Sequence, residues 1–373
     1  MTRTLLFASA LCATWAAWGQ ISVADIDPFI GTGGHGHTHP SATAPFGMVQ
    51  IGPDTRREGW DGCSGYHFTD STVWGFSHTH LSGTGVGDYG DFLFKPWGST
   101  FQDAPVAFLK SSESASAGYY GVTLADGTRA EFTAAERGGF HRYTFAQDQP
   151  AVAWIDINYR DRVLRSKVIQ FGETLILQRV SQGWAREQHA YLAVRIPAGT
   201  RVTVLDSLHV QLQFAGPDVE LAVGFSGTGP EGAERNLRAT LKESSNFARC
   251  TERSAKLWDA ELDRAQVTGG SATDRRIYAT ALYHAFSVPN LWSDADGRYR
   301  GMDGKIHDAP NHQHYTVFSL WDTYRTAHPL YALVQPERTN DFIASMLDMH
   351  DQSGRLPVWE LAGNETNCMI GYH

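Results

Sequence analysis

Hydrophobic residues between about Gly31 and Phe225 fall in short runs that lie roughly ten residues apart and are rich in β-branched and aromatic residues. Apolar and polar positions alternate within several runs, as in His209–Phe214, and turn-forming pairs such as Asp126–Gly127 separate them. Because alternation turns one side of each strand towards a core, the pattern predicts a β-sandwich. The predicted strands are Tyr120–Leu124, Arg129–Thr133, Phe140–Phe145, Ala151–Ile157, Thr174–Val180, Tyr191–Ile196, Val202–Asp206, Leu208–Phe214 and Val219–Phe225.

The hydrophobic spacing changes to three and four residues near Ser244, which indicates helices. Gly269–Gly270 end the first helical stripe, and Thr273 is placed to cap a second helix. Further helices are predicted over Ser319–Val334 and Arg338–Met349, so an all-α region follows the strands. The first stripe consists of Phe247, Cys250, Ser254, Trp258, Leu262 and Ala265, and the second of Ile277, Tyr278, Ala281, Leu282 and Ala285.

The first 19 residues have the features of an export signal. Arg3 supplies a positive charge, Leu5–Ala17 form an apolar stretch too short to cross a bilayer, and Ala17–Gly19 match a small-x-small cleavage pattern. Leu11 precedes Cys12 where a lipoprotein signal has a small residue, so release is favoured over a lipid anchor. We therefore expect a secreted or periplasmic protein, and no other segment resembles a membrane span.

Charge and composition narrow the choice of partners. The chain has 31 Lys and Arg against 40 Asp and Glu, a net charge of −9, and lacks a long basic run, so nucleic acid is not an expected partner. Its 11 Trp and 14 Tyr offer flat rings with polar rims, which suit a carbohydrate surface as well as a core. After the signal, Cys63, Cys250 and Cys368 are odd in number and widely spaced, so a disulfide framework is not expected.

Six motifs of polar and aromatic residues follow one another along the chain. They are Asp27–Gly33, Pro45–Met48, Gly59–Tyr66, Gly75–Gly85, Ser319–Arg325 and Asn364–His373. Together they resemble glycoside hydrolase family 92, and the resemblance covers the whole chain after the signal. It implies an exo-acting α-mannosidase, often α-1,2-specific, that is calcium-dependent and inverting. The fold it implies is an N-terminal β-sandwich joined by helices to a large (α/α)6 toroid.

The resemblance also implies how the chain is divided. Residues 1–19 are expected to be the signal peptide, 20–243 the N-terminal β-sandwich domain, 244–272 a helical linker and 273–373 the N-terminal part of the toroid. The chain ends within Asn364–His373, where a helix is expected to extend from its first turn, so we expect a truncated, N-terminal half. The predicted fold class is therefore a β-sandwich followed by the start of an incomplete all-α (α/α)6 toroid.

The chemistry of inversion explains what this half is expected to lack. An inverting glycosidase uses one carboxylic acid to protonate the leaving oxygen and a second carboxylate, roughly 6.5–9.5 Å away, to activate water. The resemblance places both carboxylates and most calcium ligands beyond residue 373, so it assigns no catalytic residue here and leaves the metal ligands unidentified. Calcium takes about six to eight oxygen ligands. We therefore expect this chain alone to bind an α-mannoside or N-glycan poorly and to be inactive.

The motifs nevertheless supply candidates for substrate binding. Trp60 is expected to stack on a sugar ring, and Asp61 beside it is expected to bind the sugar hydroxyls. The alternative is a glycine-rich loop that fixes a buried tryptophan. Asp322 is expected to bind hydroxyls in the −1 subsite, although the helix dipole favours Asp at a helix start regardless of function. Glu365 is either a pocket carboxylate or a helix-capping glutamate. The full set is Trp60, Asp61, Cys63, Trp321, Asp322, Glu365 and Asn367.

Histidines and one acidic loop suggest metal sites that other interpretations explain better. His78 and His80 share a face on a strand and are candidate ligands, but a structural role is favoured. The three histidines within His35–His39 offer imidazole, whereas calcium prefers oxygen. Asp294–Gly297 resembles the opening of a calcium loop, yet the position of the required glutamate is occupied by Lys305–Ile306, so we predict a β-turn.

Two other functions remain open. A glycoprotein-deglycosylating amidase needs a Cys-His-Asp arrangement with a low-pKa thiol. None of the three cysteines precedes a helix beside a basic residue, and Cys368 is expected to pack beneath the sugar pocket. If no catalytic half follows, the product is a non-catalytic carbohydrate-binding remnant.

Overall fold

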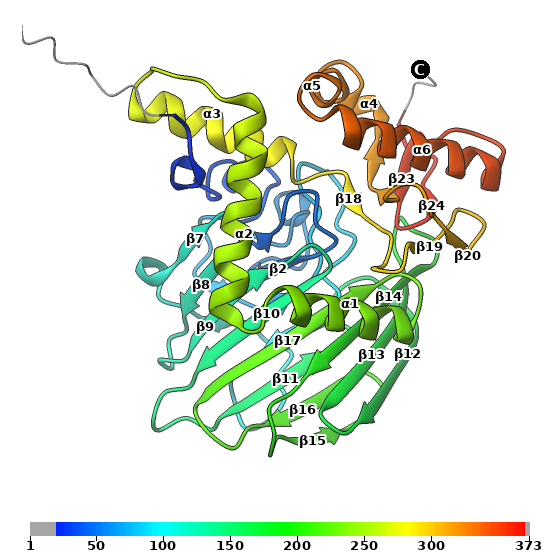
Figure 1. Ribbon diagram of the computed structural model, residues 1–373. Helices are drawn as coiled ribbons and strands as arrows, with labels where there is room; N and C mark the ends of the chain where they lie inside the picture. The colour runs from blue at the N-terminus through cyan, green and yellow to red at the C-terminus, as the bar shows by residue number, and fades with distance from the viewer. Residues whose placement is uncertain (1–19, 370–373) are drawn as a thin grey trace, which may run out of the picture.

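Two antiparallel β-sheets stacked face to face form the body of the molecule, and most of the helices gather at one end of it (Figure 1). The computed structural model describes residues 20–369, so the expected signal peptide lies outside the described residues. The first sheet has seven strands: β1 (Ala42–Thr43), β2 (Gln50–Asp54), β4 (Gly75–Ser77), β5 (Leu93–Lys95), β11 (Val152–Asp156), β16 (His209–Gln213) and β15 (Arg201–Val204). The second has eight: β12 (Arg162–Phe171), β13 (Thr174–Gln182), β14 (Gln188–Arg195), β17 (Asp218–Ser226), β10 (Gly138–Thr144), β9 (Arg129–Ala134), β8 (Tyr119–Thr123) and β7 (Ser114–Ser116).

Alternating side chains from both sheets meet in a shared core. Phe76 in β4 and Phe132 in β9 are fully buried, and their ring centroids are 4.5 Å apart across the two layers. In β16, Val210 and Leu212 are fully buried, whereas the alternate residues His209, Gln211 and Gln213 are not, as the alternation predicts. The β-sandwich is confirmed, and all nine predicted strands are present with ends that differ by at most three residues.

Strand β12 at the edge of the larger sheet was not predicted. Its pairing with β13 shifts register between Val163 and Arg165, which leaves Leu164 as an extra residue and interrupts the alternation. The strand also carries exposed Arg162, Arg165 and Lys167. Charges and a bulge are common devices that keep an edge strand from pairing with another chain, and they hide the strand pattern in the sequence.

Two helices connect the sandwich to the rest of the chain. Helix α1 (Pro230–Glu243), which was not predicted, places Ala233 and Leu237 on the outer face of the larger sheet. Helix α2 (Phe247–Leu262) follows the predicted stripe, is capped by Asn246, and buries Trp258 completely. Both helices therefore belong to the sandwich by their packing.

Helix α3 (Ala272–Ala285) begins and faces differently from the prediction. Ser271 is its N-cap instead of Thr273, because the Ser271 side chain accepts from the Asp274 amide and the Asp274 carboxylate accepts from the Ser271 amide. Its buried face contains Leu282 and Tyr283, whose ring packs 4.5 Å from that of Trp258, whereas Ile277 is 57% exposed. Leu282 of the predicted stripe is buried and Tyr278 and Ala285 are partly buried, whereas the contact of Tyr283 with α2 leaves Ile277 and Ala281 exposed.

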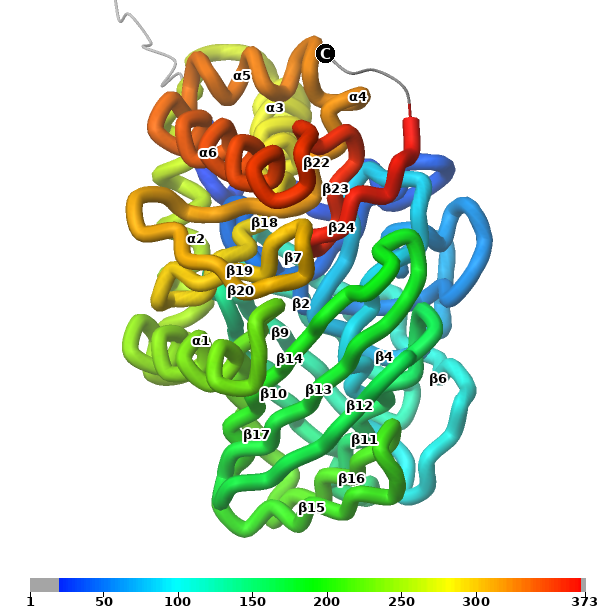
Figure 2. The backbone as a smooth tube through the Cα atoms, turned by 90° about the vertical axis from the view of Figure 1, so that its right-hand side faces the viewer, coloured from blue at the N-terminus to red at the C-terminus, as the bar shows by residue number. Residues whose placement is uncertain are grey.

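The helix predicted over Ser319–Val334 is two helices, α4 (Leu320–Thr323) and α5 (Ala327–Val334). Pro329 explains the break, because proline lacks the N–H of a continuous helix and is tolerated in the first turn of α5. Helix α6 (Pro336–Ser353) contains the predicted Arg338–Met349. Figure 2 shows α3, α5 and α6 together above the sandwich.

Short strand pairs complete the helical part. They are β18 (Asn290–Leu291) with β21 (Tyr315–Thr316), β19 (Arg298–Arg300) with β20 (Ile306–Asp308), and the sheet β22 (Phe318–Ser319), β23 (Trp359–Leu361) and β24 (Asn364–Glu365); β3 (Thr72–Val73) and β6 (Val106–Ala107) pair beside the sandwich. Residues 364–365 form a strand and are not part of the helix expected near the chain end, because Ala362 and Gly363 both have positive φ and turn β23 into β24. The end of that motif, residues 370–373, lies outside the described residues. The sandwich followed by a helical region is the predicted fold order. No helix within residues 20–369 has the length and apolar character needed to cross a bilayer.

Candidate functional site

A cavity of about 220 Å³ lies where loops of the sandwich meet the helical part. Thr38 and the segment Ser82–Thr84 line it from the sandwich. His284 in the last turn of α3, Asp322 in α4 and Tyr331 in α5 line it from the helical side. Segments from four of the six sequence motifs lie on or beside this cavity, as the following contacts show.

Trp60 and Asp61 lie on a short 3-10 turn, Trp60–Gly62, and are not among the residues that line the cavity. Trp60 is 62% exposed, so the alternative of a buried structural tryptophan is wrong. The edge of the Trp60 ring packs on His37, with centroids 4.7 Å apart. His37 in turn hydrogen-bonds the Thr84 carbonyl through Nδ1 at 2.9 Å, which connects the turn to the cavity wall.

Two histidines hold the Asp61 carboxylate. Asp61 Oδ1 lies 2.6 Å from His35 Nδ1 and 3.6 Å from His37 Nε2. The hydrogen bond from His35 lowers the pKa of Asp61, so the group is a carboxylate and an acceptor at neutral pH. A partly exposed acceptor beside an exposed aromatic ring is an arrangement that suits a sugar, whose hydroxyls and C–H face need both.

Asp322 lines the cavity from the helical part, in the first turn of α4. Ser319 Oγ donates to its Oδ2, and Trp321 beside it is 37% exposed. Among the described residues that line this cavity, Asp322 is the only one with a carboxyl group. The helix start predicted for Asp322 is confirmed, and the same position also faces the cavity.

Glu365 lies in β24 on the sheet next to α4, so the helix-capping alternative is wrong. Strand β23 lies between the start of α4 and Glu365. Ser319, just before α4, pairs with Trp359 of β23, and Glu365 in β24 pairs with Glu360 of the same strand. Glu365 is 9% exposed, and its carboxylate accepts three backbone N–H groups, those of Val358 (2.8 Å), Trp359 (3.2 Å) and Asn367 (2.9 Å). These bonds show that Glu365 fixes the hairpin beside the cavity.

The other candidate residues take different places. Cys63 is buried beneath the turn that carries Trp60, and burial raises the pKa of its thiol. Asn367 is exposed, and its Oδ1 accepts from Arg355 at 2.5 Å. Cys368 is partly buried against the main core. Of the seven candidate residues, Asp322 is the one that lines the described cavity.

The histidines of Gly75–Gly85 are structural. His78 Nε2 lies 3.0 Å from His141 Nε2 inside the sandwich, and burial lowers the pKa of His78 to about 4. His80 Nδ1 hydrogen-bonds the Gln50 carbonyl at 2.8 Å. Both side chains are buried and bonded, so the structural interpretation is confirmed. The predicted β-turn at Asp294–Gly297 is also confirmed by a 2.9 Å bond from the Gly297 amide to the Asp294 carbonyl.

The described residues around the cavity do not fit calcium. Calcium takes about six to eight oxygen ligands. Asp322 is the single carboxyl on the described lining, Asp61 is bonded to histidines, and the Glu365 oxygens accept backbone amides. Within residues 20–369 the one group of three or more metal-ligating side chains is His312, His314 and Asp348, which offers two imidazoles.

Comparison with known families identifies the class of protein to which this sandwich and its helical part belong. Residues 25–231 match the glycosyl hydrolase family 92 N-terminal domain, and residues 232–373 match the glycosyl hydrolase family 92 catalytic domain. The chain therefore belongs to glycoside hydrolase family 92, as the motifs predicted.

Solved and curated relatives agree with this assignment. The chain is similar to the family 92 α-mannosidase BT3965 of Bacteroides thetaiotaomicron, with 34% identity and a TM-score of 0.87 over 94% of this chain and 53% of that one. The complex of BT3965 with mannoimidazole gives 33% identity and the same TM-score over 94% and 51%. An uncharacterized secreted glycosidase of Arthroderma benhamiae is 30% identical, over 80% of this chain and 45% of its own length. The chain thus spans about half the length of these relatives.

Proposed function

We propose that this chain forms one wall of the mannose-binding site of a secreted, calcium-dependent, inverting exo-α-mannosidase. The substrate class we propose is α-1,2-linked mannose of N-glycans. The observation that carries the proposal is Asp322 on the lining of a cavity whose Thr84 is joined through His37 to the turn with the exposed Trp60 and the Asp61 carboxylate. The likeness to BT3965, which has been solved with mannoimidazole, supports a mannoside as the ligand.

Each proposed binding residue has a distinct task. Trp60 packs its exposed ring on the C–H face of the sugar, and Asp61 accepts hydrogen bonds from sugar hydroxyls. Asp322 binds hydroxyls of the −1 sugar from the other side of the cavity. Trp321 covers the approach along α4. Cys63 supports the Trp60 turn from below, and Glu365 with Asn367 fixes the neighbouring hairpin, so these three position the wall.

The chain supplies binding groups without a catalytic pair. Inversion uses two carboxyl groups on opposite faces of the sugar, and the described cavity lining contains Asp322 alone. We therefore propose that the acid, the base and the calcium ligands come from residues outside the described part. The 373-residue chain expressed by itself should not hydrolyse an aryl α-mannoside or mannobiose, with or without calcium. Turnover that a chelator abolishes would contradict this.

Substitution of Asp322 in the full-length gene product tests the binding role. Asp322→Ala should lower kcat/KM on an α-mannoside by roughly ten- to a hundredfold, because a hydrogen bond from a charged group contributes about 1.5–3 kcal/mol. Asp322→Asn keeps an acceptor for Ser319 and should lose less. If Asp322 only caps α4, the Tm falls while kcat/KM of the folded enzyme stays the same. That pattern would overturn the assignment.

The structure offers less support for the two alternatives. An amidase needs a thiol with a low pKa, whereas burial raises the pKa of Cys63 and raises that of Cys250 to about 11. If the chain is a carbohydrate-binding remnant, it should bind mannose tightly by itself. Titration calorimetry of the purified chain with mannobiose separates this alternative from the weak binding that a single wall should give.

A further inference from the structure

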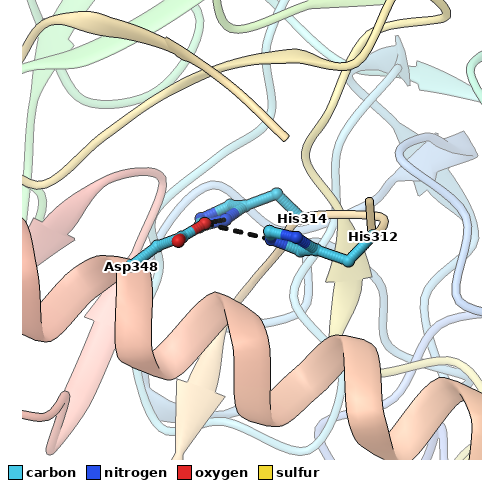
Figure 3. Close-up of side chains that lie close together, drawn as sticks. All are labelled: His312, His314 and Asp348. Atoms are coloured by element: carbon cyan, nitrogen blue, oxygen red, sulfur yellow. Dashed lines mark hydrogen bonds and ion pairs between the residues drawn. The ribbon is translucent and has the colours of Figure 1, made fainter. Parts of the chain in front are cut away.

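Three metal-ligating side chains converge outside the cavity described above, between α6 and the segment that leads into β21 (Figure 3). His312 Nε2 lies 3.0 Å from Asp348 Oδ2, and His314 Nδ1 lies 3.3 Å from the same oxygen. All three donor atoms lie within 4.8 Å of one another. Neither the sequence motifs nor the sugar-binding proposal uses these residues.

We propose that His312, His314 and Asp348 bind one divalent transition-metal ion of the zinc class. A tetrahedral zinc site has bonds of about 2.0–2.1 Å, so neighbouring ligand atoms lie roughly 3.3 Å apart. The two distances to Asp348 are close to this edge length. Two imidazoles and one carboxylate match the preference of zinc, cobalt or nickel and not that of calcium. Water would take the fourth position.

The surroundings orient the proposed ligands. Tyr299 donates its hydroxyl to Asp348 Oδ2 at 2.9 Å, and Gln352 Nε2 donates to the Tyr299 oxygen at 2.8 Å. The Tyr299 ring also stacks on His314, with centroids 3.6 Å apart and planes 10° from parallel. Such hydrogen bonds and packing contacts around the ligands are what holds them in place for a metal.

Burial leaves one side of the cluster open to an arriving ion. The side chain of His314 is 2% exposed and that of His312 is 14% exposed, whereas Asp348 is 30% exposed. The ion would therefore enter beside Asp348. Once bound, it would join α6 to the segment of His314, whose carbonyl accepts from the Trp292 amide at 2.7 Å. The expected role is a cross-link that stabilises the helical part.

Metal titration of the full chain tests the site. The chain is stripped with a chelator and titrated with Zn²⁺ in competition with a chromophoric chelator, and its Tm is followed with and without Zn²⁺. We expect one ion per chain, a Tm that rises with Zn²⁺, and no displacement by excess Ca²⁺. Cobalt should give the intense visible absorption of a tetrahedral site.

Matched variants make the result specific. His312→Gln and Asp348→Asn each remove one ligand and should lower Zn²⁺ affinity roughly tenfold or more, and Tyr299→Phe should lower it about tenfold through the lost support. His350→Gln, in the last turn of the same helix with its side chain 51% exposed, is the control and should bind as the wild type does. His312→Gln is the decisive variant because the residue is near the surface. A folded wild type that binds no Zn²⁺, or binds it no better than His312→Gln, overturns the proposal and leaves a hydrogen-bonded cluster.

Discussion

The sandwich and the helical part after α2 differ in how completely they bury apolar side chains. Leu177 in β13 and Leu192 in β14 are fully buried between the layers. In contrast, Leu333 in α5 is 81% exposed and Leu347 in α6 is 54% exposed. A sheet pair buries each inner face against the other, whereas α5 and α6 bury one stripe against each other, β21 and Phe46 of a sandwich loop, and turn the opposite stripe outward. The sandwich therefore supplies its own core, and the helical part depends on contacts made to it.

The contact between the two regions explains where the cavity forms. Phe46 from a sandwich loop packs against Phe286 and Phe342 of the helical part, with ring centroids 5.6 and 5.8 Å apart. These rings belong to the same continuous core as the inner faces of the sheets. The sugar-binding candidates Trp60 and Asp322 are attached to opposite sides of this junction, so relative placement of the two regions sets the shape of the site.

Truncation of apolar side chains in each region should give the largest contrast. Phe76→Ala opens a cavity in the sandwich core and should cost about 3–5 kcal/mol of unfolding free energy. Leu333→Ala changes a side chain that is 81% exposed and should cost less than about 0.5 kcal/mol. Urea unfolding of both variants measures the two values. Comparable losses would mean that the exposed stripe of α5 is covered in solution.

Buried charge distinguishes the regions as well. In the sandwich, Asp91 forms an ion pair with Arg179, and both side chains are fully buried. In the helical part, Glu360 in β23 accepts hydrogen bonds from the Thr316 hydroxyl and the amides of Val317 and Gly363, all of them neutral donors. Burial raises the pKa of Glu360 from its ordinary 4.5 to about 7. The folded protein therefore keeps a proton that the unfolded chain releases.

This difference predicts a pH dependence for one carboxyl group. The contribution of Glu360 to stability is fully present below about pH 4.5 and is lost as the pH rises towards 7. Glu360→Gln has no proton to lose, so the difference in unfolding free energy between wild type and variant should change by on the order of 3 kcal/mol across this range. Denaturant unfolding at several pH values measures it. Parallel stability curves for the two proteins would contradict the prediction.

The sequence predicts the sandwich better than the helical part for a local physical reason. Alternation along a strand such as His209–Gln213 reports burial residue by residue, and nine strands followed from it. Strand β12 was not predicted because its bulge interrupts the alternation. In α3, Leu282 of the predicted stripe is buried, and the contact of Tyr283 with Trp258 turns the buried face away from Ile277. Helix α1 had a usable signal in its N-terminal proline and its Ala233–Leu237 spacing.

The functional residues also differ in how far the sequence predicts them. Trp60 and Asp322 could be predicted from the sequence because each lies in a family motif. No local sequence pattern shows that both lie near one cavity. The cluster of His312, His314 and Asp348 had no such signal, since 34 positions separate His314 from Asp348 and the fold alone joins them. Long-range side-chain clusters require the packing of α6, which the sequence pattern does not specify.

The smallest expected effect distinguishes the observed start of α3, the first helix of the helical part, from the predicted one. Ser271 Oγ accepts from the Asp274 amide at 3.2 Å, and the Asp274 carboxylate accepts from the Ser271 amide at 2.9 Å. Ser271→Ala removes one half of this capping box and should cost about 1 kcal/mol. Thr273→Ala changes an exposed position inside the first turn and should stay within about 0.5 kcal/mol. Because both residues are exposed and differ by two positions, denaturant unfolding of the pair isolates the cap, and equal losses would show that Ser271 does not provide it.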